Sequence, residues 1–132
     1  MAKRVPWDPH FTVGDAALDD QHKHLLDQCN ALADCLDEDS PAAEKRFDEV
    51  FASLMRDARA HFAAEEQRLG ACGFPDLDNH RTEQEEFAYL ADEIITTENF
   101  DRIELQTFLA LWWTGHILGA AKNYRSWLSS AA

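Results

Sequence analysis

The chain has 132 residues, of which 45% are hydrophobic, and carries a formal net charge of −13. This length fits one domain with a buried core. The acidity argues against nucleic-acid binding, which needs clustered lysine and arginine at the phosphates. No apolar run reaches the roughly 18 residues of a membrane span, and no apolar leader follows Met1. We therefore expect a cytoplasmic protein without nucleic-acid or membrane partners.

The chain is expected to form a single domain over residues 1–132, opening with an irregular arm over residues 1–17. The arm lacks helical periodicity, and Trp7 is the side chain expected to pack it onto the remainder. Beyond the arm, apolar residues recur at steps of three and four, as on one face of a helix. Four stretches show this spacing: Leu18, His22, Leu25, Cys29, Leu32 and Leu36; Phe47, Phe51, Leu54, Ala58, His61, Glu65 and Leu69; Leu77, His80, Gln84, Phe87, Ala91 and Ile94; and Leu105, Leu109, Trp112, His116, Ala120 and Trp127.

Helix-breaking and capping residues separate these stretches. Ser40-Pro41 provides a cap followed by proline at the first helical position. The Gly73-Phe74-Pro75 segment ends the second helix, and Asp76 or Asp78 can cap the third. Asn99 or Asp101 can open the fourth. Because short connections favour antiparallel neighbours, the sequence predicts an all-α, antiparallel up-down-up-down four-helix bundle.

The predicted buried faces contain polar side chains, which is unusual. A buried carboxylate without a partner costs several kcal/mol or changes its pKa, and a buried imidazole needs hydrogen-bond partners. Any single one of these histidines would ordinarily be a satisfied core residue. The polar positions on the four stripes are His22, His61, Glu65, His80, Gln84 and His116.

The heights of these residues along the bundle indicate a common layer. If the second and third helices fold back near residue 73, Glu65 and His80 lie about eight and seven residues from the turn. The same counting along the other turns brings His22, His61 and His116 to this height. Imidazole and carboxylate ligands together suit iron, zinc or manganese, and facing helices commonly build dinuclear carboxylate sites. The sequence therefore predicts a metal site in the bundle core.

Several segments resemble the hemerythrin family, specifically the single-domain bacteriohemerythrins. They are Val13-Gly14, Leu18-Asp19-Asp20-Gln21-His22-Lys23, His61-Phe62-Ala63-Ala64-Glu65-Glu66, Gly73-Phe74-Pro75 followed by His80, and Trp112 through Ile117. The resemblance implies a non-haem di-iron centre that binds dioxygen. By resemblance, His22 and His61 are terminal ligands of one iron, His80 and His116 of the other, and Glu65 bridges them.

Three positions depart from the family pattern. Gln84 replaces a second histidine of the third helix, and Ala121 replaces a bridging aspartate of the fourth. Gln84 can offer an amide oxygen as a weak ligand or a hydrogen bond, whereas alanine offers nothing. Glu83 is the nearest spare carboxylate on the third helix. Trp113 stands where the family tends to carry an aliphatic residue at the ligand pocket, so it either fills that pocket or turns into the core.

The expected function is that of an iron protein binding dioxygen or a related small ligand for storage, transport or sensing. We assign no catalytic residue and expect a binding protein rather than an enzyme. Two alternatives remain open. Open coordination positions favour a metal-dependent redox enzyme, peroxidase- or oxidase-like, and loss of the metal would leave a bundle that acts as a binding module.

Overall fold

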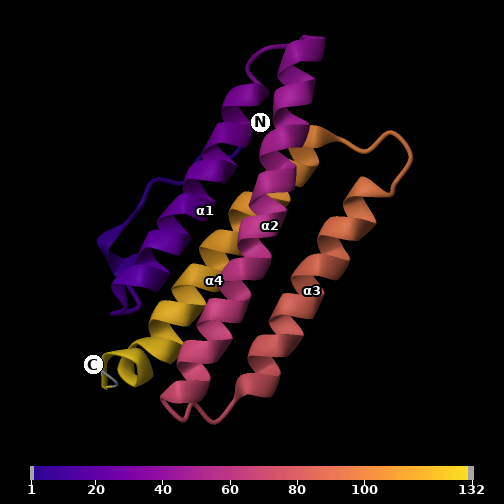
Figure 1. Ribbon diagram of the computed structural model, residues 1–132. Coiled ribbons are helices and arrows are strands. Elements are labelled where there is room, and N and C mark those ends of the chain that lie inside the picture. Colours follow the sequence, from indigo (N-terminus) through magenta and orange to yellow (C-terminus); the bar gives the residue numbers. More distant parts are fainter. Residues whose placement is uncertain (1, 131–132) are drawn as a thin grey trace.

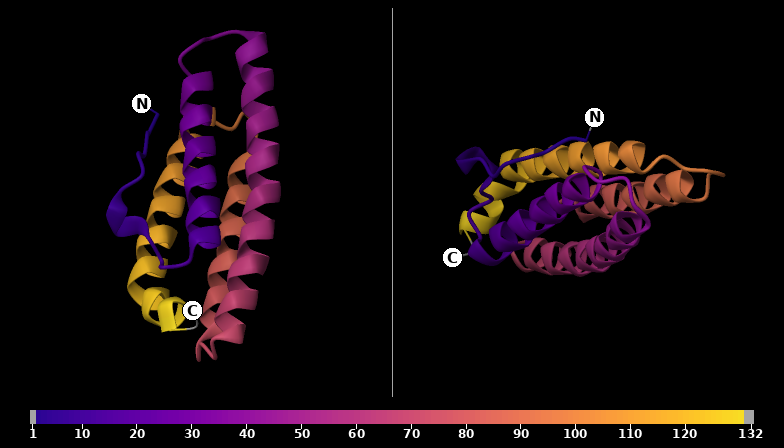
Figure 2. Two further views of the ribbon diagram at one scale, coloured as in Figure 1. Left: turned by 60° about the vertical axis from the view of Figure 1, so that its left-hand side comes forward. Right: turned by 90° about the horizontal axis from the view of Figure 1, so that it is seen from above.

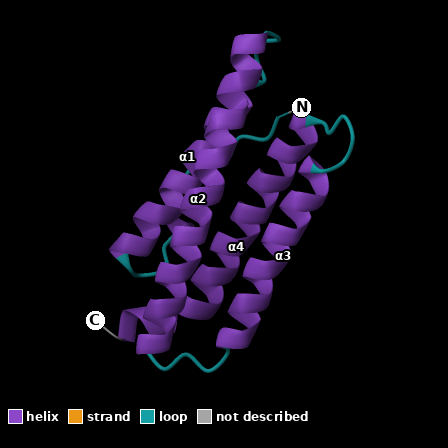
Figure 3. Ribbon diagram, turned by 45° about the vertical axis from the view of Figure 1, so that its right-hand side comes forward, coloured by secondary structure: helices purple, strands orange, loops and turns teal. Residues whose placement is uncertain are grey.

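The computed structural model describes residues 2–130 and consists of a short 3-10 helix and four long helices. The elements are η1 (Pro9–Phe11), α1 (Ala16–Cys35), α2 (Pro41–Ala71), α3 (Leu77–Ile95) and α4 (Arg102–Ser130). The described residues form helices and loops without a strand (Figure 3). The predicted all-α class is confirmed.

The four helices run antiparallel in chain order and form a bundle (Figures 1 and 2). Helix α1 packs against α2 and α4, and α3 packs against the same two helices from the other side. Helix α2 extends beyond its neighbours at the end where α1 joins it (Figure 1). This is the predicted up-down-up-down bundle.

The predicted caps explain where most helices begin. The Ser40 side chain accepts a hydrogen bond from the Ala43 amide, with Pro41 in the first turn, and Asp76 accepts one from Asn79. Helix α1 begins at Ala16 because the side chain of Asp15 accepts a hydrogen bond from Leu18 N. The irregular segment is therefore slightly shorter than the arm predicted over residues 1–17.

The N-terminal arm is fixed to the bundle by packing and by hydrogen bonds. The Trp7 ring lies 5.4 Å from that of Phe11, and the Lys23 ammonium of α1 lies over it at 5.0 Å. Gln106 of α4 binds the backbone of Lys3 in both directions, accepting from its amide and donating to its carbonyl. The arm thus covers one side of the bundle along α1 and α4.

The core has two apolar clusters. The larger, the main apolar cluster, includes Phe47, Leu54, Leu105 and Leu109, each at most 1% exposed. A smaller end cluster lies near the α2–α3 turn and contains Leu18, Leu69, Ala120, Ala121 and Tyr124, among others. No helix within residues 2–130 is long and apolar enough to cross a membrane.

Candidate metal centre

The structure brings the five predicted histidine and glutamate ligands together in the bundle core. Their side chains are 0–1% exposed. His22 comes from α1, His61 and Glu65 from successive turns of α2, His80 from α3, and His116 from α4. Every helix of the bundle therefore contributes to the cluster, as their matched heights predicted.

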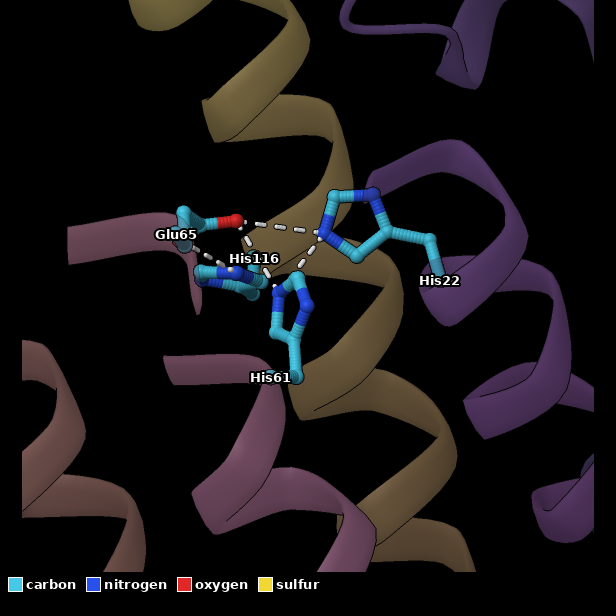
Figure 4. A group of neighbouring side chains, drawn as sticks. All are labelled: His22, His61, Glu65 and His116. Atoms are coloured by element: carbon cyan, nitrogen blue, oxygen red, sulfur yellow. Dashed lines mark hydrogen bonds and ion pairs between the residues drawn. The ribbon is translucent and has the colours of Figure 1, made fainter. Parts of the chain in front are cut away.

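Glu65 stands at the middle of this group, and Figure 4 shows three of the imidazoles pointing toward it. Its Oε2 atom lies 2.9 Å from His61 Nε2 and 3.3 Å from His22 Nε2. Its Oε1 atom lies 2.8 Å from His80 Nε2 and 3.2 Å from His116 Nε2. Each carboxylate oxygen thus faces one pair of histidines, an arrangement in which the carboxylate can bridge two ions.

Three of the donor atoms, His22 Nε2, His61 Nε2 and Glu65 Oε2, lie 2.9–3.3 Å from one another, close to the spacing of ligands of one ion. Two ligands held at about 2.1 Å from one metal, at angles between square and tetrahedral, lie about 3.0–3.4 Å apart. The ligand atoms of His22, His61, Glu65 and His116 lie within 4.8 Å of one another. His22 Nε2 and His61 Nε2 approach to 2.9 Å.

Several buried atoms of the cluster make no hydrogen bond. Glu65 Oε2 and His116 Nε2 lack one despite their close neighbours, because the contact distances are met without hydrogen-bond alignment. His22 Nδ1 and His80 Nδ1 also lack a partner. Unsatisfied buried polar atoms are costly, and a cation between Glu65 and the imidazoles would satisfy the atoms that face inward. The donor set therefore fits a metal.

His61 is held ready to donate a lone pair. Its Nδ1 lies 2.7 Å from Gln21 Oε1, and because that oxygen can only accept, the imidazole carries its proton on Nδ1. Burial lowers the pKa of His61 to about 4, which outweighs the raising effect of Glu65. At neutral pH the Nε2 lone pair of His61 therefore faces Glu65 Oε2 and accepts a hydrogen bond from His22 Nε2, both at 2.9 Å, and a cation would stabilise this electron-rich group.

Glu65 and His116 form the charged part of the cluster. Burial on its own raises the pKa of Glu65, but the charge of His116 and the close approach of the surrounding imidazoles hold it well below its usual range. Burial lowers and the Glu65 charge raises the pKa of His116, with a net rise. One negative charge thus sits at the centre, where it would offset part of the charge of a bound cation.

Trp113 is fully buried and lies beside the cluster. Its ring stacks on Phe62 at 5.3 Å and meets His61 and His116 edge-on at 5.8 and 5.3 Å. Its Nε1 has no hydrogen-bond partner. Trp113 therefore does both things that were expected as alternatives. Its ring packs in the main apolar cluster, and it also forms an apolar wall beside His61 and His116.

The altered family positions lie around the His80 and His116 side. Gln84 is half-buried on α3 and, within the described part of the chain, makes no hydrogen bond to the cluster. Ala121 is buried in the end cluster. Glu83 is half-buried, and its Oε2 accepts a hydrogen bond from the Tyr124 hydroxyl at 3.5 Å. No second carboxylate therefore joins Glu65 in the four-residue group that could hold an ion within the described residues.

Gln21, which forms a hydrogen bond with the metal-ligand candidate His61, was not predicted from the sequence to belong to the centre. It precedes His22 and lies off the apolar stripe of α1, so helical spacing gave no reason to assign it to the centre. Its role depends on how closely α1 approaches α2 at His61. His24 is exposed and pairs with Asp57 at 3.0 Å. The exposed His10 side chain lies 2.8 Å from Asp8, also outside the cluster.

Comparison with known proteins agrees with this geometry. The family model of the hemerythrin HHE cation binding domain matches residues 13–129. Two proteins named hemerythrin-like protein, from Naegleria gruberi and Naegleria fowleri, are each 29% identical over 129 residues, which cover 95% of this chain and 98% of the relative. No solved structure matches the chain significantly. Because the family model covers most of its length, the chain belongs to the hemerythrin family of cation-binding domains.

Proposed function

We propose that the chain is a non-haem iron protein of the di-iron type that binds dioxygen or a related small ligand for storage, transport or sensing. The observation that carries the proposal is Glu65, whose two oxygens each face two imidazole nitrogens at 2.8–3.3 Å. Imidazole with carboxylate suits iron among the transition metals. When bound, ferrous iron supplies the electrons on which dioxygen binding depends. A cytoplasmic location is part of the proposal, since the cysteines are free thiols.

The chain's own residues would set the conditions of binding. Gln21 fixes the proton of His61 on Nδ1, which leaves Nε2 free to bind the metal. Trp113 and Phe62 pack against His61 and exclude water from that side of the centre. Glu65 supplies the negative charge that offsets part of the charge of the iron. The protein thus orients the ligands, supplies a negative charge and shields one side of the centre from water.

Metal content and gas binding test this proposal directly. After iron-replete expression, we expect about one to two iron atoms per chain and a visible absorbance that changes with oxygen and reverses when oxygen is removed. Chelation should lower the melting temperature, because a bound ion stabilises the folded state by mass action. A protein that is isolated without metal and whose melting temperature does not change when chelator is added would instead support the binding-module alternative.

A metal-dependent redox enzyme is the second candidate, and the side facing His80 and His116 favours it. Gln84 makes no hydrogen bond to the cluster within the described residues, and alanine stands at position 121. A metal on this side would keep coordination positions for solvent or substrate, as redox and hydrolytic metal catalysts require. Turnover of hydrogen peroxide by the iron-loaded protein, lost in His61→Ala, would support catalysis. Reversible oxygen binding without turnover would support the lead proposal.

A further inference from the structure

The metal centre is sealed from solvent, so an ion needs a route to it. The side chains of His22, His61 and Glu65 are 0–1% exposed. Trp113, also fully buried, closes the core on one side. Side chains pack protein interiors without channels of ionic size. An ion therefore reaches the centre only where the packing between two helices opens.

A surface hollow between α1 and α2 reaches one member of the donor set. Its volume is about 310 Å³, and its lining residues are Asp20, Gln21, His24, Leu25, Asp57, Ala60 and His61. The half-buried Gln21 side chain is part of this lining, and its Oε1 accepts a hydrogen bond from His61 Nδ1 at 2.7 Å. The imidazole whose opposite nitrogen faces Glu65 therefore lines an open surface depression.

The hollow is negatively charged at its rim. Asp20 is exposed there, and Asp57 is held in place by a hydrogen bond from Gln28 at 2.8 Å and by His24 at 3.0 Å. The whole chain carries a net charge of −13. Carboxylates gathered at a concave surface raise the local cation concentration and the rate of association. The charge of this hollow therefore suits a cation approaching His61.

We propose that cations reach and leave the metal centre through this hollow, with Gln21 as the movable residue of its lining. The inference rests on the metal centre proposed above and adds its access route. Gln21 suits this role because it is uncharged, half-buried and joined to His61 by one hydrogen bond. A change of its rotamer frees the His61 ring without unwinding α1 or burying a charge.

Plugging the hollow tests the route, with Co²⁺ as the probe. Ala60 lines the hollow and is exposed on α2, so Ala60→Phe fills it from the surface. Ala71, exposed at the end of the same helix, lines a separate hollow with Gly14 and Arg68. We expect Ala60→Phe to slow both Co²⁺ loading and its extraction by chelator at least about tenfold, with unchanged stoichiometry. Ala71→Phe should keep wild-type rates.

A charge reversal provides an independent test that leaves the hollow open. Asp20→Lys should slow Co²⁺ loading about threefold at low ionic strength, and this difference should disappear at high salt. Asp27→Lys makes the same charge change at an exposed position of α1 outside the hollow and should have a smaller effect. Asp20→Lys should not change the extraction rate.

The outcomes separate the route from the centre. If the wild-type chain takes up no Co²⁺, the metal centre itself is wrong. If it takes up Co²⁺ and Ala60→Phe loads at the wild-type rate, or Ala71→Phe slows loading equally, the centre stands and the route is wrong. Circular dichroism of each variant shows that the compared proteins are folded.

Discussion

The core of the bundle contains a main apolar cluster and a polar layer, and these two regions differ in what they need to be stable. Leu54, Leu105 and Leu109 are fully buried in the apolar cluster, and burial of such side chains contributes about 1.5–3 kcal/mol each. In the polar layer, Glu65 and four imidazoles are almost fully buried, and several of their nitrogen and oxygen atoms lack hydrogen bonds. Burying such groups is costly without an ion.

This difference indicates that the apolar cluster stabilises the fold, whereas the polar layer provides the metal-binding function. The same helices build both regions, so the apolar cluster can hold α1, α2 and α4 in place before a cation binds to the polar layer. On this view the metal adds stability to a bundle that already exists, rather than creating it. Variants in each region should therefore have separable effects.

The largest effect is expected at Glu65. Glu65→Gln keeps the shape of the side chain and removes the charge that faces all four imidazoles. Metal affinity should fall by more than about a hundredfold, beyond the usual loss for outer partners of a metal site, while the helix content is retained. Metal analysis after dialysis and circular dichroism measure the two quantities.

Glu66→Gln is the matched control for this substitution. Glu66 is the next residue of α2 and pairs with Arg81 at the surface. It should bind metal as the wild type does. Full metal content in Glu65→Gln, or an equal loss in Glu66→Gln, would contradict the central role of the Glu65 carboxylate.

Leu54→Ala is the complementary change in the apolar cluster. Leu54 is fully buried on α2, two turns before His61, and removal of its side chain should cost about 2–5 kcal/mol of the free energy of unfolding. The number of metal ions per folded chain should not change. Urea denaturation of the chelated protein and metal analysis test this, and parallel loss of metal and stability would show that the regions are not separable.

Ala121→Asp should sharpen the contrast between the regions. The family resemblance places a bridging aspartate at this position, which is now buried in the end cluster. A new buried carboxylate should destabilise the metal-free protein by about 1–3 kcal/mol and increase the rise in melting temperature that iron produces. Ala120→Asp, at the adjacent buried position, should show the first effect alone. Equal behaviour of the two variants would place residue 121 outside the centre.

Most of the fold and the donor set were predictable because both follow from helical periodicity. The Ser40-Pro41 cap marked where α2 begins, and the turn at Gly73 determined how α2 and α3 meet, which placed Glu65 and His80 at one height. Gln84 shared the predicted layer, but it is only half-buried. The same four-residue step leads from His61 to Glu65 on α2, where both side chains are buried, so helical spacing alone did not decide which of these side chains is enclosed by its neighbours.

The contacts between helices that depend on close approach were not predictable. Gln21 lies off the stripe of α1, and its bond to His61 exists because α1 and α2 meet closely at this height. The position of Trp113 against both Phe62 and His116 likewise depends on how rings pack in three dimensions. Sequence periodicity predicts the helix face on which a residue lies, but it does not predict which side chain of another helix that residue contacts.

The smallest expected effect is the pH dependence of metal binding, which separates two histidines within the polar layer. Burial alone lowers the pKa of His116, but the Glu65 charge raises it above its usual range, so below that raised pKa a proton must leave His116 when metal binds. Burial lowers the pKa of His61 to about 4, so its proton competes only in more acidic solution.

Metal affinity should therefore rise with pH, by up to about tenfold per pH unit, as long as His116 still holds a proton that it releases to the metal. The rise should level off once the pH passes the elevated pKa of His116. Competition titrations with Co²⁺ at constant ionic strength measure the slope, and His10→Gln, an exposed position outside the cluster, should not change it. A slope of zero below pH 6.5 would mean that His116 is already neutral, and a slope of two protons would mean that a second imidazole shares its elevated pKa.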